Sequence, residues 1–193
     1  MSWAALETIG YGYHIDGSKV VKNALIWDKD IDVVWMDYSN PRNTWGNQDD
    51  WAGGLDAEMF VELLPGYSVT WDDSQWRLPD AHNQDGTGPS SGYNVTTSEM
   101  GHLFYEKNVS EFTELKASWY WSGTEYADNT DDAWNFFMPN GYQDYDDKSH
   151  NYYYGLAVRS GQVSAVPVPG AIWLLGSGLA GLTVLKRKKK NRV

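Results

Sequence analysis

Hydrophobic and polar residues alternate along the last third of the chain before residue 160, and this spacing predicts β-strands. Loops rich in Asp, Asn and Gly separate the alternating stretches, so we expect an antiparallel meander. Its strands are predicted at 118–123 (SWYWSG), 132–138 (DAWNFFM) and 152–159 (YYYGLAVR). Earlier, residues 24–36 (ALIWDKDIDVVWM) are rich in Ile, Val and Trp around a polar turn and predict two short strands, and residues 67–76 are also expected to be extended.

In two other regions apolar residues recur about every 3.6 positions, and this spacing predicts two helices. The first covers residues 49–64 and ends before Pro65-Gly66. Its apolar face consists of Ala52, Leu55, Met59 and Leu63. The second begins at a capping box, with Thr96 as N-cap and Glu99 at the third helical position, and ends near Lys107-Asn108.

These elements predict an α+β domain over residues 24–161, with two helices packed on a short antiparallel sheet. Residues 1–23 are weakly patterned, and Gly10-Tyr11-Gly12-Tyr13 favours a loop or an edge hairpin. Residues 162–169 are expected to be a linker that contains a proline motif.

The uncharged run at 170–185 predicts a transmembrane helix of about 24 Å. Six of the eight residues at 186–193 are Lys or Arg, so this end is expected on the cytoplasmic side. The alternative is a buried core helix with a solvated basic end. A core helix would have one polar face, and this run carries no charge on any face.

The tail also resembles a known sorting signal. Residues 169–179 (PGAIWLLGSGL), the preceding Pro167-Val168-Pro169 and the basic residues Arg187 and Lys188 are similar to the PEP-CTERM signal of bacterial exosortase substrates. Valine stands where the name-giving form has glutamate. The resemblance implies that an exosortase-type enzyme recognises and removes the tail; the alternative is a permanent single-pass anchor. Residues 1–7 lack the basic and apolar regions of a secretory leader, so we expect a misassigned start or a truncated gene copy rather than a chain that is not exported.

The charge of the chain is distributed unevenly. Residues 1–185 contain 9 basic and 26 acidic residues, a net charge of −17. A body this acidic is not expected to bind nucleic acid, because phosphate neutralisation needs a basic face. The absence of cysteine excludes disulfides, thiol catalysis and Cys-based zinc sites. Aromatic residues make up 15% of the chain, and exposed aromatic rings stack on sugars.

A set of motifs recurs in a fixed order between residues 24 and 161. They are WRLP (76–79), SEMGHL (98–103), YWSGTEYA (120–127), AWNF (133–136), NG (140–141) and AVR (157–159). This order resembles the Lcl C-terminal domain family, which is related to C-type-lectin-like and sulfatase-modifying-factor folds. The resemblance implies a lectin-like cell-surface domain that binds glycans or matrix components, with no reaction assigned. The candidate ligand-binding residues within the motifs are Arg77, Trp121, Glu125, Asn135 and Arg159.

Each candidate has a structural alternative. Arg77 and Arg159 could recognise an anionic ligand, or they could form ion pairs with carboxylates such as Glu99 or Glu125. In the second case Glu125 would fix a loop. The acidic loop residues Asp128, Asn129, Asp131 and Asp132 are candidate Ca²⁺ ligands, because such loops hold Ca²⁺ in lectin-like folds. The alternative is a solvated acidic loop.

Catalytic signals are weak. The histidines at positions 14, 82, 102 and 150 show no metal-ligand spacing. A glycan hydrolase needs two carboxylates about 5–10 Å apart, and Glu99, Glu125 and Asp132 are the candidates for such a pair. We expect an exported cell-surface or extracellular-matrix protein that binds a polysaccharide or has a structural role, and that is not an enzyme. The alternative functions are a secreted glycan-active hydrolase and a permanently anchored membrane protein.

Overall fold

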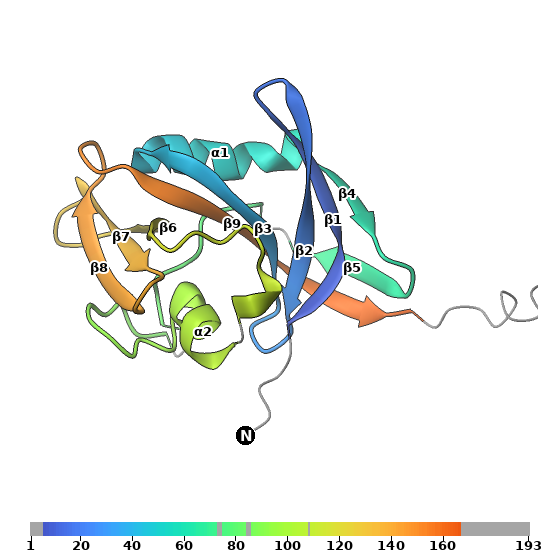
Figure 1. Cartoon of the computed structure of the whole chain (residues 1–193). Helices are drawn as coiled ribbons and strands as arrows, with labels where there is room; N and C mark the ends of the chain where they lie inside the picture. The colour runs from blue at the N-terminus through green and yellow to red at the C-terminus, as the bar shows by residue number, and fades with distance from the viewer. Residues whose placement is uncertain (1–5, 73–74, 84–85, 108, 167–193) are drawn as a thin grey trace, which may run out of the picture.

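In the computed structural model, which describes residues 6–72, 75–83, 86–107 and 109–166, nine strands form one sheet (Figure 1). The strand order is β4-β1-β2-β3-β9-β6-β7-β8, and β5 pairs with the far end of β9. The strands are β1 (Glu7–Asp16), β2 (Lys19–Asp28), β3 (Val33–Asn43), β4 (Phe60–Leu63), β5 (Tyr67–Trp71), β6 (Trp119–Glu125), β7 (Asp132–Phe137), β8 (Tyr142–Asp147) and β9 (Tyr153–Ala165). The helices are α1 (Trp45–Glu58), α2 (Glu99–Glu106) and a short 3₁₀ turn at Val109–Glu111.

The central strands of the sheet are buried on both faces, and α1 and α2 lie on opposite sides of the sheet (Figure 1). The central strands therefore contain continuous apolar runs, such as Val33–Met36 and Leu156–Val158. The core on the α2 side includes Trp35, Met100, Leu103, Tyr120, Phe136, Leu156 and Val158. The core on the α1 side includes Met36, Ala52, Leu55, Trp76, Leu78, Trp121 and Ala157. These findings confirm an α+β class with two helices on a mostly β structure.

Several predicted strands are confirmed. The strands predicted within residues 24–36 are parts of β2 and β3, and the strands predicted at 118–123, 132–138 and 152–159 correspond to β6, β7 and β9. The predicted meander is only partly right, because β8 pairs with β7 while β9 crosses to the other side of β6. There β9 runs parallel to β6 at Tyr120 and Tyr154 and antiparallel to β3.

The first predicted helix is confirmed over residues 49–58 and wrong over its last six residues. Helix α1 begins at Trp45 and ends at Glu58, and residues 60–63 form β4 instead. The physical reason is tertiary, since β4 pairs with β1 from Gly10 to Tyr13 and supplies the edge partner that β1 would otherwise lack. The helical spacing of Met59 and Leu63 does not decide their structure.

The second helix begins later than predicted. Its N-cap is Ser98, whose Oγ accepts a hydrogen bond from the Gly101 N–H at 3.2 Å, and Glu99 is the first helical residue. The predicted capping box at Thr96 does not form, because the Glu99 carboxylate bonds to Arg77 and to the Asp80 N–H instead. The predicted end at Lys107 is confirmed.

The ends of the described chain also differ from the sequence-based expectation. Residues 7–16 form β1 in a hairpin with β2, so the hairpin alternative is confirmed and the loop alternative is wrong. Residues 162–165, expected as a linker, are the end of β9 and pair with β5. Within the described ranges, neither helix has the length and hydropathy that a membrane crossing requires. The predicted transmembrane helix at 170–185 and the sorting-signal residues Pro167, Pro169, Arg187 and Lys188 lie outside the described residues.

Two glycine positions test the packing of the helices. In α2, a Cβ added to Gly101 would lie 1.7 Å from the carbonyl oxygen of Val95, so we expect Gly101→Ala to lower the free energy of unfolding by about 2 kcal/mol or more. In α1, a Cβ at Gly53 meets no atom within 4 Å. Gly53→Ala should therefore raise the free energy of unfolding by about 0.5–1 kcal/mol. Urea denaturation measures both values. A similar effect of the two substitutions would contradict the close approach of α2 to Val95.

Candidate functional site

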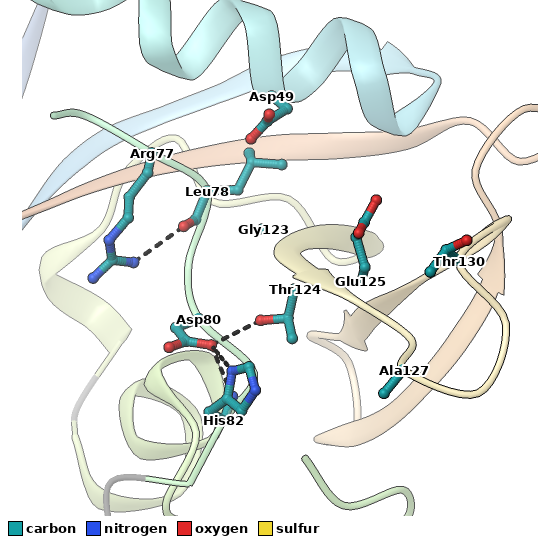
Figure 2. A pocket seen from close by; sticks show the side chains of 10 residues that line it. All are labelled: Asp49, Arg77, Leu78, Asp80, His82, Gly123, Thr124, Glu125, Ala127 and Thr130. Atoms are coloured by element: carbon teal, nitrogen blue, oxygen red, sulfur yellow. Dashed lines mark hydrogen bonds and ion pairs between the residues drawn. The ribbon is translucent and has the colours of Figure 1, made fainter. Parts of the chain in front are cut away.

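A cleft of about 580 Å³ opens beside the end of β6 (Figure 2). Three parts of the chain form it: the first turns of α1, the extended segment 77–82, and the end of β6 with the loop that follows. The residues that line it are Asp49, Arg77, Leu78, Asp80, His82, Gly123, Thr124, Glu125, Ala127 and Thr130. The cleft therefore collects polar groups from regions up to about 80 positions apart in the sequence.

Arg77 closes one end of the cleft and is held by an ion pair. Its guanidinium donates two hydrogen bonds to the carboxylate of Glu99, at 2.8 and 2.7 Å. Its backbone forms an isolated bridge to Val158 of β9, which fixes the segment against the sheet. Burial alone would lower the pKa of Arg77, but the pairing with Glu99 raises it overall, so the group stays charged.

Asp80 forms the adjoining wall, and one of its carboxylate oxygens is held by three contacts. Asp80 Oδ1 accepts hydrogen bonds from the Thr124 hydroxyl at 2.7 Å and from the His82 backbone N–H at 2.9 Å. It also lies 2.8 Å from His82 Nδ1, and Figure 2 shows the three side chains together. Burial alone would raise the pKa of Asp80, but these hydrogen bonds lower it overall. Asp80 is therefore a carboxylate in a fixed orientation at neutral pH.

The opposite wall carries two further carboxylates. Asp49 projects from α1 over the cleft, and Glu125 projects from the end of β6 (Figure 2). Glu125 forms an ion pair with Lys148, and the same ammonium group donates to the Thr130 carbonyl at 2.6 Å. Partial burial, followed by the nearby charges of Asp50 and Glu125, raises the pKa of Asp49.

The chemistry of the cleft is that of a hydrogen-bonding surface with excess negative charge. Its one guanidinium, on Arg77, is neutralised by Glu99, whereas the carboxylates of Asp49, Asp80 and Glu125 remain as acceptors. Such a surface disfavours an anionic ligand. It suits ligands with many hydroxyl groups or with a positive charge, since fixed acceptors do not have to be reorganised on binding.

The structure places two of the five predicted ligand residues, Arg77 and Glu125, in this cleft. In both, the structural alternative is present: Arg77 pairs with Glu99, and Glu125 ties the 126–131 loop through Lys148. Arg159 pairs with Asp56 at 2.7 Å and lies over the Trp71 ring, away from the cleft residues.

Trp121 and Asn135 are fully buried on neighbouring strands. The indole N–H of Trp121 donates to the Asn43 carbonyl at 3.2 Å, so this ring serves the core and offers no stacking surface. The Asn135 amide donates to Asp146 at 3.3 Å, and its side-chain oxygen has no hydrogen-bond partner among the described residues.

The candidate calcium loop between β6 and β7 is held by its own hydrogen bonds. The Asn129 amide donates to Asp132 at 3.0 Å, and the Tyr126 hydroxyl donates to Asp128 at 3.2 Å. Within the described part of the chain, Asp128, Asp131 and Asp132 do not form a group of three carboxylates whose oxygens lie within 4.8 Å of one another. The loop geometry matches the solvated-loop alternative.

Among the described residues, one group does meet that distance criterion: Asp28, Asp30 and His102. It lies where α2 meets the β2–β3 turn. The ammonium group of Lys107 already occupies its centre, 3.1 Å from Asp28 Oδ1 and in contact with Asp30. Burial would raise the pKa of Asp28, but hydrogen bonds with His102 and Lys107 lower it overall. The arrangement is a buried ion-pair network with a lysine in the place of a metal ion.

Sequence reasoning missed most of the cleft. The sequence patterns assign no site role to Asp49, Asp80, Thr124 or Thr130, and they treat His82 only as one of four scattered histidines. One signal was available, because Asp80 directly follows the Trp-Arg-Leu-Pro motif that contains Arg77. The contribution of α1 could not be anticipated, since no local pattern relates residue 49 to residue 125.

Comparisons of the chain with protein-family models, with curated proteins and with solved structures found no match. The two family resemblances of the sequence motifs stay predictions. The site is therefore interpreted from its own geometry.

The ion pair between Arg77 and Glu99 should stabilise the cleft wall. We expect Glu99→Gln to lower the free energy of unfolding by about 1–3 kcal/mol, because the substitution leaves a half-buried guanidinium without its charge partner. The matched control is Glu114→Gln, which breaks the exposed pair with Lys116 and should cost less than about 1 kcal/mol. Thermal unfolding of both variants measures the difference, and equal costs would contradict the role given to Glu99.

Proposed function

We propose that this chain is an exported binding protein of the cell surface or extracellular matrix, and that its cleft binds a glycan. One observation carries the proposal: the polar groups of the cleft are held in place by partners within the protein. Glu99 holds Arg77, Thr124 and His82 hold Asp80, and Lys148 holds Glu125. Sugar hydroxyls donate to fixed carboxylates, so recognition of this kind needs little rearrangement.

The sequence supports the location. Residues 167–188 resemble a sorting signal in the order of their parts, and the body before it has a net charge of −17. The proposed sequence of events is export, recognition of the tail by an exosortase-type enzyme, and release or attachment of the body. A permanent anchor is the alternative, and it leaves the binding domain on the same side of the membrane.

Binding in the cleft is tested with two neighbouring residues of α1. Asp49 lines the cleft, whereas Asp50 does not. We expect Asp49→Ala to weaken binding to a responsive polysaccharide about tenfold, since a hydrogen bond to a charged acceptor contributes about 1.5 kcal/mol or more. Asp50→Ala should change the affinity less than twofold. Affinity electrophoresis against a panel of polysaccharides identifies the responsive polymer and then measures both variants. Binding by the wild-type chain that neither substitution weakens would move the site away from the cleft.

The alternative of a glycan hydrolase is favoured by one observation. The raised pKa of Asp49 suits a general acid, and Glu125 supplies a second carboxyl group in the same cleft. Asp132, a candidate for this pair in the sequence, lies outside the residues that line the cleft, and Glu99 is engaged with Arg77. Under the binding proposal, the responsive polysaccharide keeps its chain length after long incubation. Release of reducing ends that stops in both Asp49→Asn and Glu125→Gln would establish the hydrolase instead.

Processing of the tail is tested by the mass of the mature protein. We expect the exported chain to end between Pro167 and Gly170, because the sorting signal would be removed there. Intact-mass spectrometry of envelope and medium fractions measures this end. A mature chain that retains Val193 in the membrane fraction would support the permanent anchor. As a control, deletion of residues 186–193 should leave the body folded and prevent processing.

A further inference from the structure

A row of aromatic side chains crosses one face of the sheet at β6, β7 and β8. The strand register places Trp119 opposite Phe137, and Phe137 opposite Tyr142. An isolated bridge between Gly92 and Gln143 extends the register by one position and places Tyr93 beside Tyr142. Tyr153 of β9 lies at the other end. We call these five residues the aromatic row.

Contacts between the rings connect the row from end to end. Trp119 stacks on Phe137 with a centroid distance of 4.6 Å and on Tyr153 with a distance of 5.7 Å. Trp119 also meets the Tyr142 ring at 6.4 Å, and Tyr142 meets Tyr93 at 4.8 Å. Neighbouring strands are about 4.8 Å apart, so five positions span roughly 19 Å.

The aromatic row is accessible to solvent. Tyr93 is 58% exposed, and the other four side chains are partly exposed. This contrasts with Tyr120 and Phe136, which alternate with the row on the same strands, point to the opposite face and are fully buried. The row therefore combines a hydrophobic surface with access from outside.

Polar groups lie directly beside the row on the same face. The next register position on this face holds Asp144 opposite Asn135. The following position on the same face holds Asp146 opposite Ala133. Asp146 accepts a hydrogen bond from the Tyr153 hydroxyl at 2.7 Å, which fixes that end of the row. The face thus has an apolar strip and, along one side of it, a line of hydrogen-bond acceptors.

We propose that the aromatic row is a second binding surface, and that its ligand is an extended, uncharged polysaccharide. The flat faces of pyranose rings carry C–H groups that stack on aromatic rings, while the hydroxyl groups at the ring edge donate to carboxylates such as Asp144 and Asp146. The length of the row suits several consecutive sugars rather than one. This inference rests on the proposed function in one respect, which is that the ligand of the protein is a glycan.

The charge of the surface selects against acidic polymers. Asp144 and Asp146 lie beside the row, and the body as a whole has a net charge of −17. A polyuronate would meet these like charges, whereas a neutral chain meets only hydrogen-bond acceptors. Arg42 near the Tyr153 end donates to the Ser118 hydroxyl at 2.7 Å and supplies a single positive charge against the two carboxylates.

The test uses two tyrosines of the same strand. Tyr142 belongs to the row, and Tyr145 points to the opposite face, where it stacks on Tyr126 at 3.8 Å. Affinity electrophoresis and tryptophan fluorescence quenching are carried out on the wild-type chain and both alanine variants. The polymers are neutral glucans and mannans, with alginate as the acidic comparison. Circular dichroism and thermal unfolding verify that each variant is folded. Asp144→Asn tests the acceptor line without removing a ring.

We expect Tyr142→Ala to weaken binding to a neutral polysaccharide at least tenfold, Asp144→Asn to weaken it several-fold, and Tyr145→Ala to leave it within twofold. Neutral polymers should quench tryptophan fluorescence through Trp119, and alginate should not. Equal affinities of wild type and Tyr142→Ala, with Asp49→Ala still weakened, would overturn the second surface and leave the proposed function in place. Absence of binding to every polymer by the wild-type chain would overturn both. Tighter binding to alginate than to neutral polymers would overturn the proposed ligand class.

Discussion

The pairing of β9 with three other strands is the constraint on which the rest of the structure depends. This strand runs antiparallel to β3, touches β6 in parallel, and pairs with β5 at its far end. Its central residues, Leu156 to Val158, alternate between the two cores and are completely buried. Without β9 the sheet would be two separate groups of strands, β4-β1-β2-β3 and β6-β7-β8, with no strand pairing between them.

The cleft depends on the same strand. The backbone of Arg77 bonds to Val158 in an isolated bridge, which fixes the irregular segment that supplies Arg77 and Asp80 against β9. A buried polar side chain also connects α1 to β9. Gln48 of α1 is fully buried and donates to the carbonyl groups of Pro41 and Tyr153. A loop site therefore gains the rigidity of the core, which is what ligand recognition by fixed polar groups requires.

Strands with buried apolar side chains could be predicted from the sequence. Strands that form because a neighbouring strand offers hydrogen-bond partners could not. The apolar runs around Val33 and Leu156 identify β3 and β9 because they are buried whichever way the sheet is assembled. In contrast, β8 (YQDYDD) has the composition of a loop and becomes a strand because β7 offers it a complete register. The residues of the cleft divide in the same way. Arg77 and Glu125 lie in recognisable motifs, whereas the contribution of Asp49 depends on the packing of α1 across the sheet.

The central position of β9 has a consequence for how the chain acquires its structure. Among the described strands it is the last to leave the ribosome, and it joins the two groups of strands. Until residue 153 has emerged, β3 and β6 each have an open edge beside apolar side chains, and such edges invite pairing with other chains. Joining them late, through contacts distant in sequence, makes folding slow. The protein can complete its fold only after nearly all of its domain has been synthesised, so any helper that shields open strands should act on β3 and β6.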